Sequence, residues 1–189
     1  AVSNDGFTNW KIDKQPTFLP KPDEFPEELY GIEDPRIVKL EKENSTYSIA
    51  YTSFSQNGPL VSLATTTDFE TFRRYGAAMP PDDKDASLFP RKFNERWVLL
   101  HRPSPSNNIY GAHIWVSFSP DLKHWGDSAV LLPVRKGSWW DAYKVGLGPP
   151  PIETSEGWLI IYHGVKTTAA GSLYRLGLAL LDLDDPQKI

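Results

Sequence analysis

The chain has 189 residues, a formal net charge of −4 and no cysteine. Its hydrophobic content of 40% and charged content of 23% are typical of a globular protein and exclude a disordered one. The acidic balance argues against nucleic acid as a partner, because a phosphate backbone attracts a basic surface. We expect neither a membrane span nor a secretory leader, because every apolar run is short and the chain opens with polar residues. The lack of cysteine excludes disulfides and favours a cytoplasmic location.

Short apolar segments, rich in β-branched and aromatic residues, recur along the chain and predict strands rather than helices. The 17 prolines also limit the length of any helix. The predicted strands come in consecutive pairs, at residues 47–51 and 60–64, 97–101 and 113–117, and 158–162 and 175–180. Each pair is preceded by a further short segment, at 33–37, 85–90 and 148–152, and followed by an acidic turn, at 67–69, 119–122 and 183–186.

This unit occurs three times, and a further copy of its turn lies at residues 3–10. Repeats of this length with several short strands are typical of the blades of a β-propeller. We therefore predict an all-β propeller, of which the chain covers about three to four blades, in a single domain over residues 1–189. A closed propeller needs at least about four blades, so we expect the domain to be incomplete at its N-terminus. The alternative is a meandering β-sandwich whose turns resemble one another by chance.

Polar residues at the starts of the innermost strands are candidates for a shared site, because these strands line the channel of a propeller. The first unit opens with Glu33, Asp34 and Arg36, and the second with Lys84 and Asp85. Further candidates lie close to strands of the second and third units: Arg102, Asp141, Lys144 and His163. A funnel with a few acids, several cations and nearby Trp suits a reaction between a sugar and an anion. Each residue alone also fits an ordinary role, in a solvated ion pair or as a buried histidine.

Other catalytic patterns are absent from the sequence. It has no glycine-rich phosphate loop followed by Lys, and no Gly-x-Ser-x-Gly elbow. Its four histidines lack the spacing of zinc ligands, so we predict no metal site. Asn44, Ser45 and Thr46 match the acceptor pattern for N-glycosylation, a short pattern that also arises by chance.

Six ordered motifs, spread over nearly the whole chain, resemble the β-mannoside phosphorylases of glycoside hydrolase family 130. The motifs lie at residues 31–37 (Gly-Ile-Glu-Asp-Pro-Arg-Ile), 84–90 (Lys-Asp-Ala-Ser-Leu-Phe-Pro), 100–103 (Leu-His-Arg-Pro), 146–152 (Gly-Leu-Gly-Pro-Pro-Pro-Ile), 157–164 (Gly-Trp-Leu-Ile-Ile-Tyr-His-Gly) and 180–186 (Leu-Leu-Asp-Leu-Asp-Asp-Pro). Members of this family are five-bladed propellers and markedly longer. The resemblance therefore implies that the first blade and its channel residues are missing here.

The resemblance implies that Asp34 is the single catalytic acid. It would protonate the glycosidic oxygen through the 3-hydroxyl of the mannosyl unit. Inorganic phosphate would attack the anomeric carbon from the opposite face and give α-mannose 1-phosphate by inversion. One carboxylate is enough because phosphate is already an anionic nucleophile, whereas an inverting hydrolase needs a second carboxylate to activate water. Phosphate is then a co-substrate, and no other cofactor is implied.

The resemblance also implies which residues contact phosphate and which contact the mannosyl unit. Five of them would bind phosphate or lie beside it: Lys84, Arg102, Lys144, His163 and Tyr174. Four would contact the mannosyl unit: Arg36, Asp85, Trp140 and Asp141. Family members often have Arg at the position of Lys84, and a lysine would hold phosphate as a point charge, without the bidentate fork of a guanidinium.

Two alternatives to a phosphorylase stay open. The first is a hydrolase on the same propeller, which should lose the basic cluster and supply a base carboxylate, whereas Lys84, Arg102 and Lys144 are all present. The second is a propeller that binds sugars without turning them over. The expected partners are a mannoside oligosaccharide, with β-1,2-linked oligomannosides as the first candidate, and phosphate. A homo-oligomer is also compatible with the sequence, because acceptor contacts can come from a neighbouring subunit.

Overall fold

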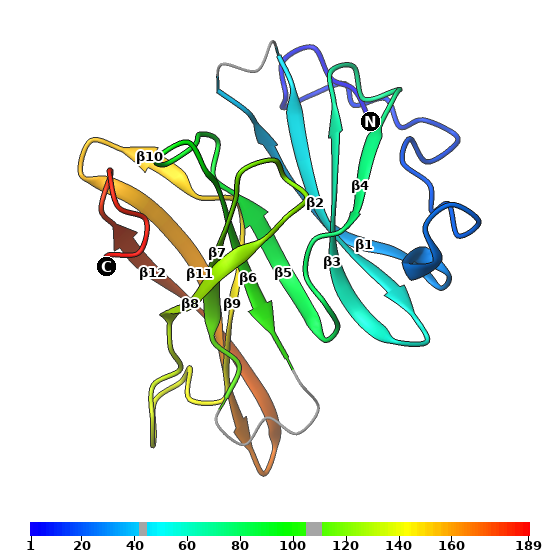
Figure 1. Ribbon diagram of the computed structural model, residues 1–189. Coiled ribbons are helices and arrows are strands. Elements are labelled where there is room, and N and C mark those ends of the chain that lie inside the picture. Colours follow the sequence, from blue (N-terminus) through cyan, green and yellow to red (C-terminus); the bar gives the residue numbers. More distant parts are fainter. Residues whose placement is uncertain (42–44, 105–110) are drawn as a thin grey trace.

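The computed structural model describes residues 1–41, 45–104 and 111–189 (Figure 1). Asn44, the acceptor of the glycosylation pattern, lies outside these residues. The described chain contains three antiparallel sheets, each of four strands, and one short 3-10 helix, η1 (Pro26–Glu28). No helix in the described part of the chain is long and apolar enough to cross a membrane.

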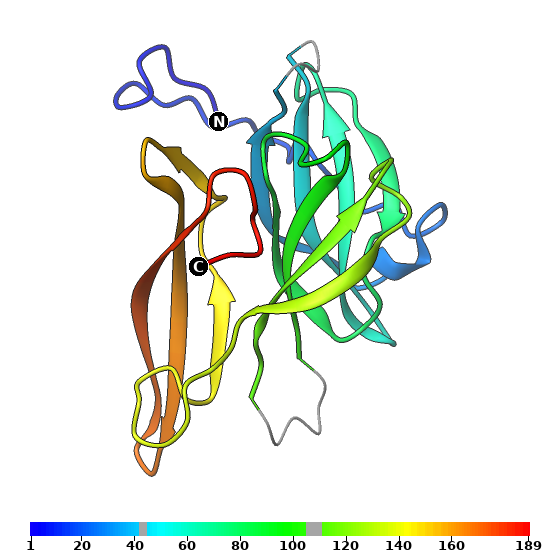
Figure 2. The same ribbon diagram turned by 60° about the vertical axis from the view of Figure 1, so that its left-hand side comes forward.

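The three sheets follow one another along the sequence and around the molecule, and are called blades 1 to 3 (Figures 1 and 2). Blade 1 consists of β1 (Gly31–Lys39), β2 (Tyr47–Ser55), β3 (Gly58–Thr66) and β4 (Arg73–Ala77). Blade 2 consists of β5 (Asp83–Leu88), β6 (Trp97–Pro103), β7 (Ile114–Ser119) and β8 (Gly126–Leu132). Blade 3 consists of β9 (Lys144–Leu147), β10 (Ile152–Thr154), β11 (Gly157–Thr168) and β12 (Gly171–Leu181).

The first strand of blade 3 is broken in two. β9 and β10 both pair with β11, and the chain between them is Gly148 followed by three prolines. Proline has no N–H to give to a ladder, so the pairing stops there and resumes at Ile152. The segment predicted at residues 148–152 therefore falls on the break rather than on a continuous strand.

The predicted architecture is confirmed. The chain is all-β, each predicted pair of strands overlaps two neighbouring strands of one blade, and the segments at 33–37 and 85–90 overlap β1 and β5. The outer strands β4 and β8 were not predicted. Blades 1 and 2 each have the strand order of a meander, with the first strand on the inside.

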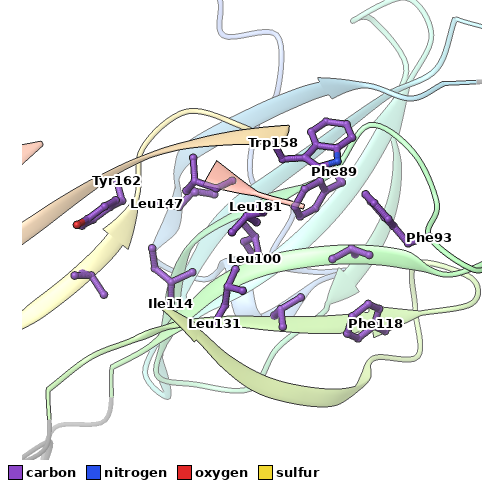
Figure 3. Close-up of a cluster of buried hydrophobic side chains, with 14 residues drawn as sticks. Phe89, Phe93, Leu100, Ile114, Phe118, Leu131, Leu147, Trp158, Tyr162 and Leu181 are labelled. Atoms are coloured by element: carbon purple, nitrogen blue, oxygen red, sulfur yellow. The ribbon is translucent and has the colours of Figure 1, made fainter. Parts of the chain in front are cut away.

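Apolar layers between the blades hold the sheets together. The larger layer lies between blades 2 and 3 and includes Leu100 from β6 and Leu147 from β9 (Figure 3). Trp158 of β11 is fully buried in it and meets the ring of Phe89 edge-on, with 5.1 Å between the centroids. A second layer joins blades 1 and 2 through side chains such as Val61 and Leu99. These layers fix the positions of the inner strands relative to one another.

The outer faces of the terminal blades differ. On blade 1, Phe18 covers Tyr51, with 5.1 Å between the ring centroids, and the buried carboxylate of Glu28 accepts the Tyr51 hydroxyl at 2.8 Å and pairs with Arg74. On blade 3, the leucines of β12 that point away from blade 2 are open: Leu176 is 74% exposed and Leu178 is 68% exposed. The N-terminal segment therefore protects one end of the array of blades.

The repeated acidic turns share one hydrogen-bonding pattern. In the turn between β3 and β4, one oxygen of Asp68 accepts the N–H of Thr71 at 2.8 Å and the other accepts its hydroxyl at 2.7 Å. Asp121 does the same with the N–H and ring of His124 in the next blade, and Asp5 with Thr8 near the N-terminus. Such bonds favour the charged carboxylate, so they lower the pKa of Asp5, Asp68 and Asp121.

We predict that the turn aspartates make the fold sensitive to acid. A carboxyl whose pKa is lower in the folded state contributes stability above its ordinary pKa of about 4, and this contribution is lost as the pH falls through the folded value. The Tm of Asp121→Ala should therefore lie below that of the wild type at pH 7, and the difference should stay constant down to about pH 5 and begin to shrink below about pH 4. Thermal unfolding over this range measures it. Asp23→Ala, at an exposed aspartate outside these turns, is the control, and an equal effect of both variants would contradict the prediction.

We predict that Trp158→Ala destabilises the protein by about 3–5 kcal/mol, because it leaves a cavity between blades 2 and 3. Trp139→Ala removes the same side chain from a position that is 53% exposed, and should cost far less. Urea unfolding of both variants tests the difference. Equal losses would show that the layer around Trp158 does not hold the two blades together.

Candidate functional site

Two matching β-bulges place an aspartate at the start of each of the first two inner strands. The pairing register shifts between Glu33 and Arg36 in β1 and between Lys84 and Ser87 in β5. Asp34 and Asp85 lie in these bulges with positive φ angles of 51° and 53°. Aspartate tolerates this left-handed conformation better than most residues. A bulge re-aims a side chain, and both of these occur at the same end of neighbouring blades.

Asp85 is the centre of a buried ionic cluster. It is 5% exposed, and its Oδ2 accepts the Nε–H of Arg102 at 2.8 Å and pairs with Nη2 of the same guanidinium at 2.7 Å. Its Oδ1 lies 3.6 Å from Nη2 of Arg36, and its Oδ2 lies 3.6 Å from Nε2 of His163. Charge-assisted bonds of this kind are the strong ones in proteins, and burial strengthens them further. The carboxylate therefore orders side chains from all three blades.

Arg36 reaches across from blade 1 to the end of β9. Its Nε–H donates to the carbonyl of Gly148 at 2.7 Å, and its Nη2 donates to the carbonyl of Leu147 at 2.8 Å. Its Nη1 is 3.3 Å from the carbonyl of Asp34, within its own bulge. The guanidinium is thus bound to protein groups in all three blades, which stabilises the junction between them.

The remaining cations lie at the rim of this cluster. Nζ of Lys84 is 3.4 Å from the carboxylate of Glu33, across the junction of blades 1 and 2. Nζ of Lys144 lies 5.3 Å from the centre of the Tyr174 ring, on the face of blade 3 that also carries His163. The rings of Tyr174 and His163 are 6.0 Å apart. Phosphate-binding residues proposed from the sequence therefore gather in one region.

His163 is held in its neutral form at neutral pH. Burial lowers its pKa, and the positive charges of Arg102, Lys144 and Arg36 act in the same direction, while the charge of Asp85 opposes them. A neutral imidazole has one N–H donor and one acceptor nitrogen. It can therefore hydrogen-bond a phosphate or a sugar hydroxyl without adding charge.

Asp34 differs from Asp85 in being open to solvent. Within the described part of the chain, no cation lies within 4.0 Å of its carboxylate. Its carboxyl group is thus available to a ligand, while the backbone around it is held by Pro35 and by Arg36. The sequence predicted that acids and cations at the starts of the inner strands share one site, and the role of Asp34 in it stays a prediction.

Comparison with known proteins gives the family. Residues 1–189 match the family described as beta-1,4-mannooligosaccharide phosphorylase. The chain belongs to glycoside hydrolase family 130. It is 40% identical to a 1,2-beta-oligomannan phosphorylase of Thermoanaerobacter sp. (strain X514), over 100% of this chain and 59% of the relative. It is 35% identical to a beta-1,4-mannooligosaccharide phosphorylase of Ruminococcus albus, over 100% of this chain and 56% of the relative.

A solved structure of the family agrees with the fold. The beta-1,2-mannobiose phosphorylase from Listeria innocua, in complex with beta-1,2-mannobiose, superposes with a TM-score of 0.85 at 39% identity. The alignment covers 98% of this chain and 49% of that structure. The chain thus spans about half the length of the family 130 relatives it matches, and its three blades are part of a propeller.

Two residues proposed to contact the sugar lie away from this cluster. Asp141 is 2% exposed, and its carboxylate accepts Nε–H of Arg135 at 2.8 Å and lies 3.4 Å from the Tyr162 hydroxyl. Trp140 stacks on the Tyr162 ring at 5.9 Å. Tyr162 and His163 point to opposite faces of β11, because neighbouring strand residues alternate. The structure thus gives Trp140 and Asp141 a packing role, and their contact with sugar stays a prediction.

Gly146 is a site residue that was not predicted. A Cβ added to it would overlap the Asp85 carboxylate and would lie 2.6 Å from Cε1 of His163. Only glycine leaves room for these two side chains to approach β9. The Gly-Leu-Gly sequence before the prolines was a visible signal, but it fits a structural turn equally well.

We predict that Gly146→Ala displaces Asp85 and His163 and destabilises the protein by about 1–3 kcal/mol through overpacking. Gly126→Ala is the matched control, because a Cβ there meets no atom within 4 Å and its φ angle is unexceptional. It should be neutral or stabilising by up to about 1 kcal/mol. Urea unfolding measures the stability of the two variants. Equal stability would contradict the close approach of Asp85 and His163 to Gly146.

Proposed function

We propose that the protein is an inverting phosphorylase that cleaves β-mannosides with inorganic phosphate and releases α-mannose 1-phosphate. The observation that carries this proposal is the set of ordered cations from three strands, Lys84, Arg102 and Lys144, beside the exposed carboxyl of Asp34. Relatives over the full length of this chain are named as phosphorylases of β-1,2- and β-1,4-linked mannosides.

The charges of the cluster favour an anionic co-substrate. Asp85 faces two guanidinium groups, so its single negative charge leaves one positive charge uncompensated there. Lys144 lies against an aromatic ring in the described structure and adds another positive charge. Preorganised cations are what phosphoryl oxygens require, and they cost little reorganisation when the ligand enters.

The reaction needs one acid from the protein. The bond between the anomeric carbon and the glycosidic oxygen breaks as a phosphate oxygen bonds to that carbon from the opposite face. The proton of Asp34 passes to the leaving oxygen through the 3-hydroxyl of the mannosyl unit. Phosphate supplies its own nucleophilic oxygen, so no base is needed to activate it.

Hydrolysis by water would require a base carboxylate in addition to Asp34. Within the described cluster the other carboxylates are Glu33 and Asp85. Asp85 is buried against two arginines, and Glu33 faces Lys84 at 3.4 Å. Asp85 is thus committed to its cations and has almost no surface for a water to approach, which supports phosphate over water as the nucleophile.

The finer assignments rest on the relatives. Two relatives that are 40% identical are named for β-1,2 linkages, so we propose a β-1,2-linked oligomannoside as the substrate. We place the protein in the cytoplasm, which is consistent with the absence of cysteine. The exposed leucines of β12 support an association with further protein on that face, from the same chain or from a partner subunit.

The test is to incubate the full-length protein with β-1,2-mannobiose, with and without inorganic phosphate, and to assay α-mannose 1-phosphate. Product should form only with phosphate. Asp34→Asn should lower kcat by at least about 100-fold, the typical contribution of general acid catalysis. Asp184→Asn, at another exposed aspartate, should leave it unchanged. Free mannose formed at equal rates in both tubes would identify a hydrolase, and full activity of Asp34→Asn would remove Asp34 from the mechanism.

A further inference from the structure

A chain of buried hydrogen bonds crosses blade 2 with one side chain from each strand. Asp83 Oδ2 in β5 lies 2.6 Å from Nδ1 of His101 in β6. Nε2 of His101 lies 2.8 Å from Oγ of Ser117 in β7, and Ser117 Oγ lies 2.7 Å from Oγ of Ser128 in β8. Asp83, His101 and Ser117 are 2%, 3% and 0% exposed, whereas Ser128 is exposed on the outer strand. We call Asp83, His101 and Ser117 the relay.

The relay has the residue types of a hydrolytic triad, but its burial excludes that function. A nucleophilic serine must meet a substrate carbonyl, and Ser117 has no exposed surface. The directions of the bonds are nevertheless consistent along the chain. When Nδ1–H donates to the Asp83 carboxylate, Nε2 of a neutral His101 is an acceptor for the Ser117 hydroxyl. The relay therefore orders Asp83 rather than activating Ser117.

Asp83 connects the relay to the backbone of the cations of the site. Its Oδ1 accepts the backbone N–H of Arg102 at 3.0 Å, and Lys84 follows Asp83 directly in β5. Lys84 and Arg102 are directly paired across β5 and β6, just before the register shift of the bulge. The carboxylate thus fixes the backbone of Arg102, and through the strand pairing that of Lys84, at the point where β5 departs from regular pairing.

Blade 1 shows that the fold does not require the relay. Glu33 pairs with Thr52 as Lys84 pairs with Arg102, and both pairs stand at the same bulge. Aligned on these pairs, the three positions of the relay carry Ile32, Tyr51 and Ala64 in blade 1, which pack in one apolar cluster while the Tyr51 hydroxyl donates to Glu28 outside it. Two blades with the same strand pairing therefore use opposite solutions. Buried polar groups cost free energy unless they are paired, so a chain of them across all four strands of blade 2, without a counterpart at the aligned positions of blade 1, points to a local function.

We propose that Asp83, His101 and Ser117 are positioning residues that hold Lys84 and Arg102 in place for phosphate. The assignment rests on the proposed phosphorylase function, since it concerns the phosphate subsite of that reaction. The relay does not touch substrate. Its side chains lie on one face of blade 2, whereas the side chains of Lys84 and Arg102 point from the opposite face, so the relay acts on the two cations through their backbone. Loss of the relay should therefore weaken phosphate binding and leave the mannosyl subsite largely intact.

The test compares two identical changes in sister blades of the full-length protein. Ser117→Ala removes the hydroxyl that holds His101. Ser53→Ala removes a hydroxyl with the same burial, 0% exposed, that donates to Ser62 at 2.7 Å in blade 1. Ser53→Ala breaks one buried hydrogen bond, and Ser117→Ala breaks the bonds to His101 and Ser128, so Ser117→Ala should lose at least as much stability. Only Ser117→Ala should raise the KM for phosphate, by about tenfold, the usual size of a lost supporting contact, with the KM for mannobiose nearly unchanged.

Asp83→Asn provides a second variant with the same expectation, because an amide cannot accept from both His101 and the backbone of Arg102 as a carboxylate does. Binding of inorganic phosphate, followed by calorimetry, gives a readout apart from turnover. If the wild type and both variants bind phosphate with equal affinity, the positioning role of the relay is contradicted and the proposed function stands. Wild-type protein that binds no phosphate would overturn the proposed function and this assignment with it.

Discussion

The ionic contact between Asp85 and the guanidinium groups of Arg36 and Arg102 is the interaction on which the arrangement of the site depends. It lies where the inner strands of three blades meet, and no single blade could form it. Without the carboxylate, the buried Arg102 and the partly buried Arg36 would repel each other and lose their shared partner. Breaking a buried pair of this kind typically costs about 3–5 kcal/mol, more than one surface ion pair contributes. The packing between blades and the charge of the site are therefore coupled.

The same interaction separates the two bulge aspartates into different tasks. Asp34 and Asp85 have nearly the same backbone conformation and the same position in their blades. Asp85 is buried and paired with cations, while Asp34 faces solvent and keeps its carboxyl free. Repetition of the blade thus supplies two copies of one geometry, and the surroundings of each copy decide its chemistry.

Much of the fold could be predicted from local sequence patterns, because residues close together in the sequence determine the turns and the middle strands. Asp68 and Asp121 close their turns with bonds to residues two and three positions ahead, so a short motif determines the geometry. The outer strand β8 has no clear alternation and is largely exposed, so its sequence carries no strand signal. The break at Gly148 was readable as a turn, but its place within an inner strand depends on pairing with β11.

The site was predictable only in part, for a different reason. Charged residues at the starts of inner strands were expected to converge, and Asp34, Arg36, Lys84 and Asp85 lie at two neighbouring bulges. Which cations a carboxylate binds depends on the packing of blades far apart in sequence, such as Arg36 on the carbonyl of Gly148. The face on which Asp141 lies depends on the register of β11, and its pairing with Arg135 is not visible in any spacing. The functional roles of these residues remain predictions.

The contrast between blades 1 and 2 bears on how such a site is built on a repeated fold. Tyr51 and His101 occupy the same position, and one joins an apolar cluster while the other lies in a polar chain. The blade 1 solution is the simpler one for stability, because the Tyr51 hydroxyl, bonded to Glu28, is the single side-chain polar group at the three aligned positions. A polar chain is fully bonded only in one arrangement, so it specifies the position of each member more strictly. Blade 2 bears two cations proposed to bind phosphate, Lys84 and Arg102. Phosphate binding needs these cations in fixed positions, and blade 1 has no such requirement.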